Sequence, residues 1–297
     1  MTFYRSLGQA YREEFGEPVR KVSVNANLPC PNKANGGCIF CNETSFSPSK
    51  ELGDVSIPIQ IQEGIRRLQF QGKVQKFIAY FQPGTNTFGP VERLERLYRE
   101  AMSQPKIVGL AIGTRPDCLA EEVLDLLETL SRETALTLEI GVQSVQDTSL
   151  RFLNRGHDFA AIDDAVRRIQ RRHIRFGVHL ILGLPGETRE DRTGTAEKIA
   201  QYRPYSVKFH NLYVLKNTKL AELWEQGKVP LPTLEEYAEY VVDFLERIPP
   251  ETVIERISGE AKEELLLAPD WTARKHAARN AVDQEFRKRK KASHGPD

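Results

Sequence analysis

Three cysteines lie within twelve residues, and their spacing is the feature of the sequence that points most directly to chemistry. Cys30, Cys38 and Cys41 enclose a segment rich in glycine and proline, which specifies a loop able to wrap three thiolates round one centre. Cys118 stands alone, and we expect it to be a buried bystander. The N-terminus carries no long apolar signal segment, so we expect a cytoplasmic, reducing setting, where clustered cysteines bind metal rather than form disulfides.

The number of cysteines bears on which metal they hold. A structural zinc ion normally needs four protein ligands, and neither Cys118 nor a nearby histidine completes such a set. Three cysteines suit a [4Fe–4S] cluster, in which thiolates hold three irons and the fourth iron stays open for a substrate or cofactor. Structural zinc and unrelated free cysteines are the alternatives that the spacing alone leaves open.

The pattern C-x7-C-x-F-C after a first strand resembles the radical S-adenosylmethionine (radical SAM) enzymes. In that superfamily the open iron chelates the amino and carboxylate groups of SAM. One electron from the cluster then cleaves SAM to a 5′-deoxyadenosyl radical, which abstracts hydrogen from the substrate. The resemblance implies a [4Fe–4S] cluster on Cys30, Cys38 and Cys41, with SAM as the second cofactor. It also implies that Phe40 stacks near the SAM adenine, for which a core aromatic is the plainer alternative.

Further motifs follow successive strands in an order similar to the Elongator-like branch: IGTRPD (112–117), LEIGVQS (138–144), NRGH (154–157) and HLILGLPGET (179–188). Residues 80–87 and 257–261 resemble segments of a narrower bacterial group, the YhcC-like family. The resemblance runs from about Tyr11 to Arg287. Two positions depart from it: the loop between the first two cysteines is shorter, and Gly113 stands where relatives often carry an acid. That SAM contact is therefore not carried over.

The same resemblance assigns the SAM methionyl amine to the turn at residues 83–87. Thr85, Asn86 and Thr87 are its candidate cofactor-binding residues. Carbonyls and hydroxyls at the end of a barrel strand suit an ammonium group. An ordinary βα turn is the alternative interpretation.

Other SAM contacts implied by the resemblance follow later strands. Gln143 matches a position that contacts the SAM ribose. Arg155 matches one that pairs with the SAM carboxylate, a role that suits its planar guanidinium, although a surface charge is the alternative. His179 stands where relatives carry a polar residue near the ribose, with a hydrogen-bonded core histidine as the alternative. Gly183 permits close backbone approach, and Thr188 opens the next helix as a possible N-cap.

Two polar residues alternate on the sixth expected strand. Lys208 and His210 are two positions apart, so both can face the barrel interior. Either can hold an anionic group of the substrate, and either can be a packed, hydrogen-bonded side chain. The sequence assigns no catalytic residue.

Six strand-like runs alternate with amphipathic segments, and this alternation predicts the elements that must position the motifs. We expect strands at 21–26, 76–82, 108–114, 136–142, 176–182 and 206–214. Helices are expected at 57–69, 90–102, 121–130, 159–172 and 189–202. Such alternation requires a mostly parallel sheet. It favours an α/β fold with a partial (β/α)6 TIM-type barrel, with a doubly wound sheet as the alternative.

The expected organisation is an N-terminal helical segment (1–20), the barrel (21–214), a C-terminal α/β extension packed on it (215–286) and a basic, disordered tail (287–297). The extension is expected to hold a helix at 234–248, a strand at 252–257 and a helix around 272–288. The formal net charge is +1. Without the five charges of residues 287–291 it is 1 − 5 = −4, which excludes a generally basic nucleic-acid binder.

The resemblance implies a radical SAM enzyme that modifies tRNA, turning a wobble-uridine carboxymethylaminomethyl side chain into aminomethyl. It also implies an electron donor such as flavodoxin or ferredoxin. Radical chemistry on a small molecule or protein is one alternative, and a non-catalytic Fe–S or zinc module is another. No apolar run approaches the ~18 residues of a membrane span, so no membrane partner is expected.

Overall fold

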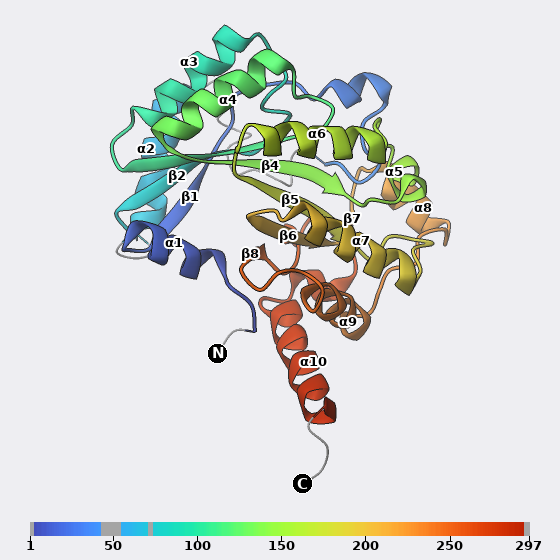
Figure 1. The fold of residues 1–297 in the computed structure, drawn as a ribbon. Coiled ribbons are helices and arrows are strands. Elements are labelled where there is room, and N and C mark those ends of the chain that lie inside the picture. Colours follow the sequence, from blue (N-terminus) through green and yellow to red (C-terminus); the bar gives the residue numbers. More distant parts are fainter. Residues whose placement is uncertain (1–2, 43–54, 71–73, 294–297) are drawn as a thin grey trace.

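The computed structural model describes residues 3–42, 55–70 and 74–293. Seven parallel strands form one curled sheet in the order β1-β2-β3-β4-β5-β6-β8 (Figure 1). Their bounds are β1 (Val19–Val24), β2 (Lys76–Phe81), β3 (Ile107–Thr114), β4 (Ala135–Gln143), β5 (Phe176–Leu182), β6 (Ser206–Asn211) and β8 (Val253–Arg256). This confirms the expected partial barrel, with one strand more than the six that the alternation predicted.

Helices cover the convex face of the sheet (Figure 1). Those between the strands are α2 (Ile57–Phe70), α3 (Val91–Met102), α4 (Glu121–Glu133), α5 (Asp147–Phe152), α6 (Phe159–Arg171) and α7 (Arg189–Tyr202). The remaining elements are α1 (Leu7–Phe15), η1 (Pro31–Asn35), β7 (Val214–Leu215), α8 (Lys219–Glu225), α9 (Leu234–Leu245), β9 (Leu266–Ala268), η3 (Asp270–Ala273) and α10 (Ala277–Ser293). The expected strands and helices of the barrel agree with these bounds to within a few residues.

The two faces of the sheet differ in chemistry because side chains alternate along each strand. The convex face is apolar, and buried residues such as Phe81, Ile112 and Leu180 belong to the core shared with the helices. The concave face carries polar residues at the intervening positions, among them Glu139 and Lys208. The barrel therefore has a hydrophobic wall round a polar interior.

The N-terminal segment closes one end of this interior. Tyr11 of α1 packs against Ile78 and Tyr80 of β2 and against Ala111 of β3. The segment just before α1 pairs with β8, where the Ile254 N–H donates a 2.8 Å hydrogen bond to the Arg5 carbonyl. The polar interior is thereby open mainly toward the carboxyl ends of the strands.

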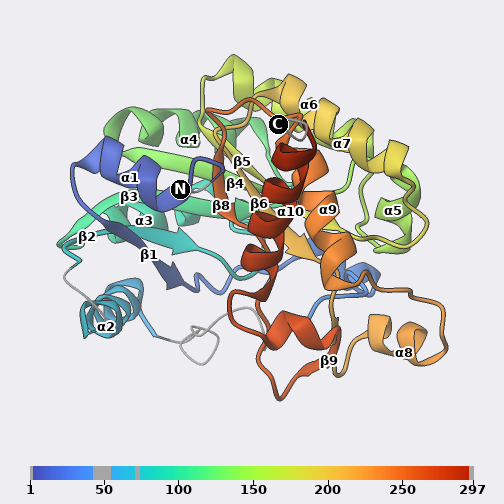
Figure 2. The same ribbon diagram turned by 90° about the horizontal axis from the view of Figure 1, so that it is seen from below.

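The C-terminal region is more integrated than the sequence indicated. It is not simply packed on the barrel, because β8 pairs with β6 inside the main sheet. The expected disordered tail is also wrong for residues 287–293, which continue α10 beside α9 (Figure 2). Arg289 anchors this turn through ion pairs with Asp243, Glu246 and Glu285. Residues 294–297 lie outside the described part of the chain.

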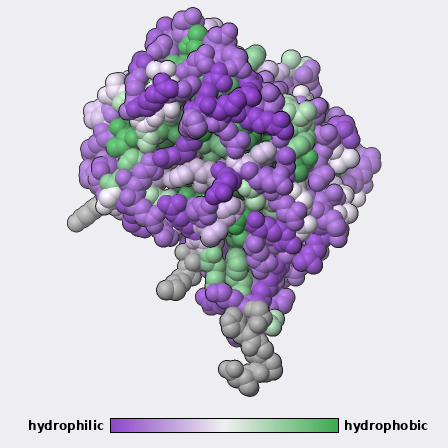
Figure 3. All heavy atoms as spheres, in the orientation of Figure 1, coloured by the Kyte–Doolittle hydropathy of each residue, from purple (hydrophilic) through white to green (hydrophobic). Residues whose placement is uncertain are grey.

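The surface in the orientation of Figure 1 is mostly hydrophilic, as expected for helices that turn their polar faces outward (Figure 3). In the described ranges, none of the helices has the length and apolar character that a membrane crossing needs.

Candidate active site

A cavity of about 460 Å³ opens at the carboxyl ends of the strands and descends into the polar interior. Ten of the residues singled out from the sequence line it: Cys30, Cys38, Cys41, Phe40, Thr85, Gln143, Arg155, His179, Lys208 and His210. These residues come from the cysteine loop, from the ends or interiors of β2, β4, β5 and β6, and, for Arg155, from the segment that follows α5. The fold thus gathers in one place groups that are up to 180 positions apart in the chain.

Asn86 and Thr87 do not line this cavity. Both are buried behind it, where the Asn86 amide donates 3.0 Å hydrogen bonds to the carbonyls of Phe81 and Gly113. The Thr87 hydroxyl lies 2.5 Å from the Cys118 carbonyl. These contacts tie the ends of β2 and β3 together, so both side chains hold the turn that carries Thr85.

Gly183 also lies off the cavity. Its φ of +87° is in the left-handed region, and a β-carbon there would be 2.7 Å from Pro232, so glycine is needed to fit the turn. Thr188 caps α7 through a reciprocal capping box with Asp191. Cys118 is buried, and burial raises the pKa of its thiol to about 12, which suits the bystander that the sequence predicted.

The cysteine loop is held by the segment that follows α5. The Asn32 amide donates to the Asn154 carbonyl at 2.7 Å, and the Asn154 amide donates back to the carbonyls of Asn35 and Gly37 at 3.0 and 2.7 Å. Gly156 has a φ of +70°, and a β-carbon on it would be only 2.3 Å from Asn32 Oδ1. Asn154 and Gly156, the residues before and after Arg155, therefore fix the loop between the cysteines.

None of the four cysteines is in a disulfide, and Cys30, Cys38 and Cys41 are all at least partly accessible. Within the described ranges, no three Cys, His, Asp or Glu side chains are arranged round one metal ion, as a mononuclear zinc site requires. A cubane cluster makes no such demand, since each cysteine binds a different iron.

Two arginines border the cysteines. Arg155 Nη1 lies 3.2 Å from Cys38 Sγ, and its Nη2 donates to the Gly141 carbonyl at 2.6 Å. Arg115 forms a two-pronged ion pair with Asp117 at 3.0 and 2.9 Å, and it donates to the Arg155 carbonyl. Although burial opposes its charge, Asp117 holds the pKa of Arg115 above the usual value. The guanidinium groups make this end of the cavity cationic.

The floor of the cavity is a buried ion network centred on Glu139. This carboxylate contacts Lys21, Lys208 at 3.1 Å and His179 at 2.7 Å. Lys21 also reaches Glu255 on β8, so one ammonium joins β1, β4 and β8 across the open side of the barrel. The network contains two lysines and two glutamates, and their charges balance.

Burial alone would raise the pKa of Glu139, but the ammonium groups of Lys208 and Lys21 hold it well below the usual range. Burial lowers the pKa of Lys208, against the opposing effect of Glu139. Burial and the charge of Lys208 also lower the pKa of His179, so its ring is neutral near pH 7. The ring of Tyr80 lies between the two ammonium groups, 5.0 Å from Lys21 and 4.7 Å from Lys208.

Comparison with known proteins decides the family. The chain matches the Radical SAM superfamily over residues 28–199 and the Radical_SAM C-terminal domain over residues 204–288. The chain belongs to the radical SAM superfamily.

Relatives of this radical SAM enzyme include Bacillus subtilis YtqA, 34% identical over 290 residues (96% of this chain, 90% of YtqA). Escherichia coli YhcC is 35% identical over 270 residues (89% and 86%). The tRNA uridine(34) acetyltransferase of Methanocaldococcus jannaschii is 28% identical over 154 residues, which is 51% of this chain and 28% of that protein. The structure of Methanocaldococcus infernus Elp3 shares the fold, with a TM-score of 0.67 at 19% identity, over 91% of this chain and 63% of Elp3. The YhcC-like and Elongator-like resemblance is thus confirmed.

As a radical SAM enzyme, the protein uses a [4Fe–4S] cluster and SAM. The cavity fits both groups. Besides the three cysteines, it is lined by residues whose buried polar atoms have no partner within the described chain: Arg155 Nε, Arg115 Nη1 and Thr85 Oγ1. Each such atom costs about 1–3 kcal/mol unless something bonds to it. A cofactor with carboxylate, amino and hydroxyl groups supplies suitable partners.

Several residues of the site were missed from the sequence. Glu139 had a usable signal, because it lies two and four positions before Gly141 and Gln143 on the same face of one strand. Arg115 stood inside a motif already noted. Arg256 had no such signal, because its place depends on the pairing of β8 with β6, which local pattern does not reveal.

Proposed function

We propose that this radical SAM enzyme acts on the wobble uridine of tRNA, converting its carboxymethylaminomethyl side chain into aminomethyl. With SAM as the two-electron oxidant and water as co-reactant, the carboxymethyl group would leave as glyoxylate, alongside 5′-deoxyadenosine and methionine. The YhcC-like motifs imply this reaction, and similarity to a tRNA uridine(34) acetyltransferase over half of the chain supports a tRNA substrate. The observation that carries the proposal is that the three-cysteine loop and a set of interior cations line one cavity. A site for SAM and a site for an acidic side chain are thereby within reach of each other.

In this proposal Cys30, Cys38 and Cys41 each ligate one iron. When bound, the reduced cluster supplies the electron that cleaves SAM and so starts radical chemistry on the substrate. Arg155 holds the SAM carboxylate with its Nε–H, the guanidinium nitrogen that has no partner among the described residues. A β-carbon at Gly141 would lie 3.2 Å from Arg155 Nη2, so a larger residue there would press on this guanidinium.

The other cavity residues orient the rest of SAM. Thr85 offers a buried hydroxyl to the methionyl amine, Gln143 reaches the ribose, and Phe40 lies over the adenine. The exposure of Cys41 supports a cluster that an electron donor such as flavodoxin or ferredoxin can approach. A tRNA substrate places the enzyme in the cytoplasm.

The decisive experiment has two stages. Anaerobic reconstitution should give a brown protein whose reduced EPR signal changes on addition of SAM and which forms 5′-deoxyadenosine under dithionite. Mass spectrometry of tRNA nucleosides from a deletion strain should then show carboxymethylaminomethyl-uridine accumulating at the expense of aminomethyl-uridine. An unchanged wobble-uridine profile would exclude the tRNA substrate and favour a small molecule or protein.

A further inference from the structure

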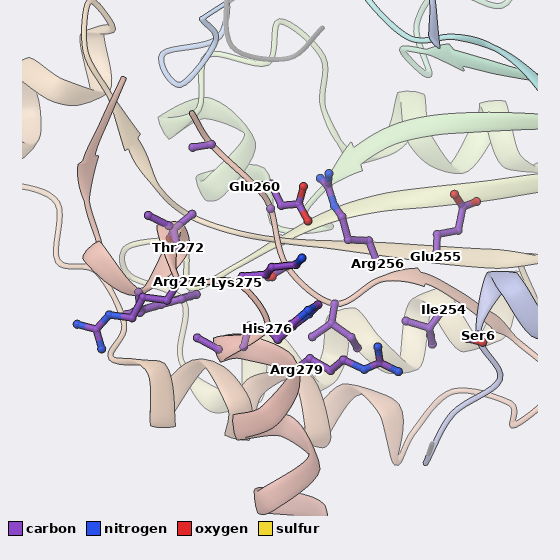
Figure 4. Close-up of a pocket in the computed structure, with 18 of the residues that line it drawn as sticks. Ser6, Ile254, Glu255, Arg256, Glu260, Thr272, Arg274, Lys275, His276 and Arg279 are labelled. Carbon is purple, nitrogen blue, oxygen red and sulfur yellow. The ribbon is translucent and has the colours of Figure 1, made fainter. Parts of the chain in front are cut away.

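A second cavity, of about 610 Å³, lies between the end of β8 and the segment that leads into α10 (Figure 4). Its exposed rim carries Lys275 and Arg279. Arg256 lines both this cavity and the one that contains the cysteines. In Figure 4 its side chain points away from the α10 side, toward the barrel. Arg256 is therefore at the junction of the two cavities.

Within the described ranges, Arg256 has no carboxylate partner, unlike the neighbouring lysines. Lys21 and Lys208 are balanced by Glu139 and Glu255. Arg256 forms no ion pair with any carboxylate in the described part of the chain, and its Nε is buried with no hydrogen-bond partner. A guanidinium keeps its charge at any physiological pH, so this positive charge has no carboxylate within ion-pair distance among the described residues, although Glu260 lines the same cavity (Figure 4).

Among the described side chains, the one that hydrogen-bonds to Arg256 is the imidazole of His210. Nη2 lies 2.8 Å from Nδ1 and 2.7 Å from Nε2 of His210. Burial, together with the charge of Arg256, holds the pKa of His210 well below its usual range, so the ring is neutral. A neutral ring accepts a hydrogen bond from the guanidinium and so orients it, but it adds no negative charge.

Comparison with Arg115, a buried arginine that contacts an acid, shows what is missing at Arg256. Arg115 has a two-pronged pair with Asp117. The Nε–Nη edge that makes such a pair with a carboxylate is not used by any acid at Arg256. Because a half-buried charge without a counterion is costly, the arrangement is suited to an anion that arrives from outside.

We propose that Arg256, held by His210, is the receptor for the carboxylate of the substrate side chain. This inference rests on the proposed function, in which the group that is removed carries that carboxylate. The second cavity is then the side from which the rest of the nucleotide enters, past the basic rim of Lys275 and Arg279. A phosphate of the RNA backbone is the other anion that the same guanidinium can bind.

The test uses the reconstituted enzyme with SAM and two anticodon stem-loop RNAs, one with carboxymethylaminomethyl-uridine and one with aminomethyl-uridine. The native enzyme should bind the carboxylated RNA about 10- to 100-fold more tightly, the range expected for a charge-assisted pair. Arg256→Gln should bind both RNAs equally, and Arg256→Lys should keep part of the preference. Arg96→Gln, on the exposed face of α3, is the matched control and should behave like the native enzyme. An unchanged preference in Arg256→Gln, with substrate still converted, overturns the inference but leaves the proposed function intact.

A second measurement does not depend on the tRNA substrate. The Nε–H signal of Arg256, identified by its absence from the spectrum of Arg256→Lys, is followed by ¹⁵N NMR during titration with sodium acetate and with inorganic phosphate. A shift with acetate supports a carboxylate receptor even if the tRNA reaction is never observed. A shift with phosphate alone assigns the residue to the RNA backbone and overturns the carboxylate assignment. No shift with either anion overturns the receptor altogether.

Discussion

Substituting Gly156 by alanine should damage the cluster site through the loop that carries the cysteines. Gly156 has a φ of +70°, and the added β-carbon would lie 2.3 Å from Oδ1 of Asn32. Asn32 lies in η1, between Cys30 and Cys38. A change outside the cysteine loop is therefore expected to displace the loop itself.

The size of the effect follows from two terms. An alanine in the left-handed region costs about 1–2 kcal/mol. Relief of the close contact requires the Asn32 amide to move, which gives up its 2.7 Å hydrogen bond to the Asn154 carbonyl, worth about 1 kcal/mol. The sum is a loss of about 2–3 kcal/mol in the free energy of unfolding.

Two other glycines separate these terms. Gly186 has a φ of +82° but no atom within 4 Å of its would-be β-carbon, so alanine there should cost only the backbone term of about 1–2 kcal/mol. Gly194 is in α7 with open space around it, and alanine should stabilise that helix by up to about 1 kcal/mol. Only Gly156→Ala should also disturb the cysteines.

The assay compares urea unfolding of the three cluster-free variants, followed by iron and sulfide content after anaerobic reconstitution. We expect Gly156→Ala to be the least stable and to retain less than half of the iron of the native enzyme. The reasoning is refuted if Gly156→Ala is no less stable than Gly186→Ala and binds iron equally well.

Three further predictions concern the cysteines and the buried charges. Cys41→Ala should abolish both the cluster and the formation of 5′-deoxyadenosine, whereas Cys118→Ser should leave iron content unchanged; equal iron loss in both would contradict the assignment. Glu139→Gln leaves the ammonium groups of Lys21 and Lys208 with a single carboxylate of the network, that of Glu255. It should lower the free energy of unfolding by about 3 kcal/mol, and this loss should be smaller when Lys21 is also replaced by methionine. His179 and His210 are half-buried, and desolvation holds their pKa values below the usual 6.5. Below about pH 6.5 the unfolded chain takes up protons that the native protein does not, so stability should fall toward pH 5, by up to about 1.4 kcal/mol per pH unit for each histidine. A flat stability curve over this range would show that the rings are already protonated in the native state.

Local pattern was sufficient to predict most of the barrel. Strands with both faces covered read as short β-branched or aromatic runs, so 176–182 was located to the residue as β5. The helices of the barrel were also predicted to within a few residues, because their apolar residues repeat at helical spacing along the chain. The cavity residues of β4, β5 and β6 could be named because each ends or lines a strand at the open end of the barrel.

Other parts depend on contacts between distant segments. The basic run at 287–291 looked like a solvated tail, yet ion pairs of Arg289 with α9 and with α10 itself hold it in a helix. Asn154 and Gly156 looked like neighbours of a SAM ligand, whereas in the structure they brace the cysteine loop. Neither the ion pairing of Arg289 nor the bracing by Asn154 and Gly156 produces a periodic pattern in the sequence, because each depends on the position of a second, distant segment in the fold.

The buried charges explain how an incomplete barrel keeps a polar interior. A sheet of seven strands does not close on itself, so β1 and β8 cannot share backbone hydrogen bonds as neighbouring strands do. Lys21 spans that gap, since its ammonium contacts Glu255 on β8 and Glu139 on β4. An apolar residue at position 21 would leave the carboxylates of Glu139 and Glu255 with Lys208 as the remaining lysine of the network. Removing one partner of a buried ion pair in this way is strongly destabilising, because a buried charge is left without a counterion. The same network that closes the barrel therefore also pairs Lys208 with Glu139, whereas Arg256 pairs with no carboxylate in the described part of the chain.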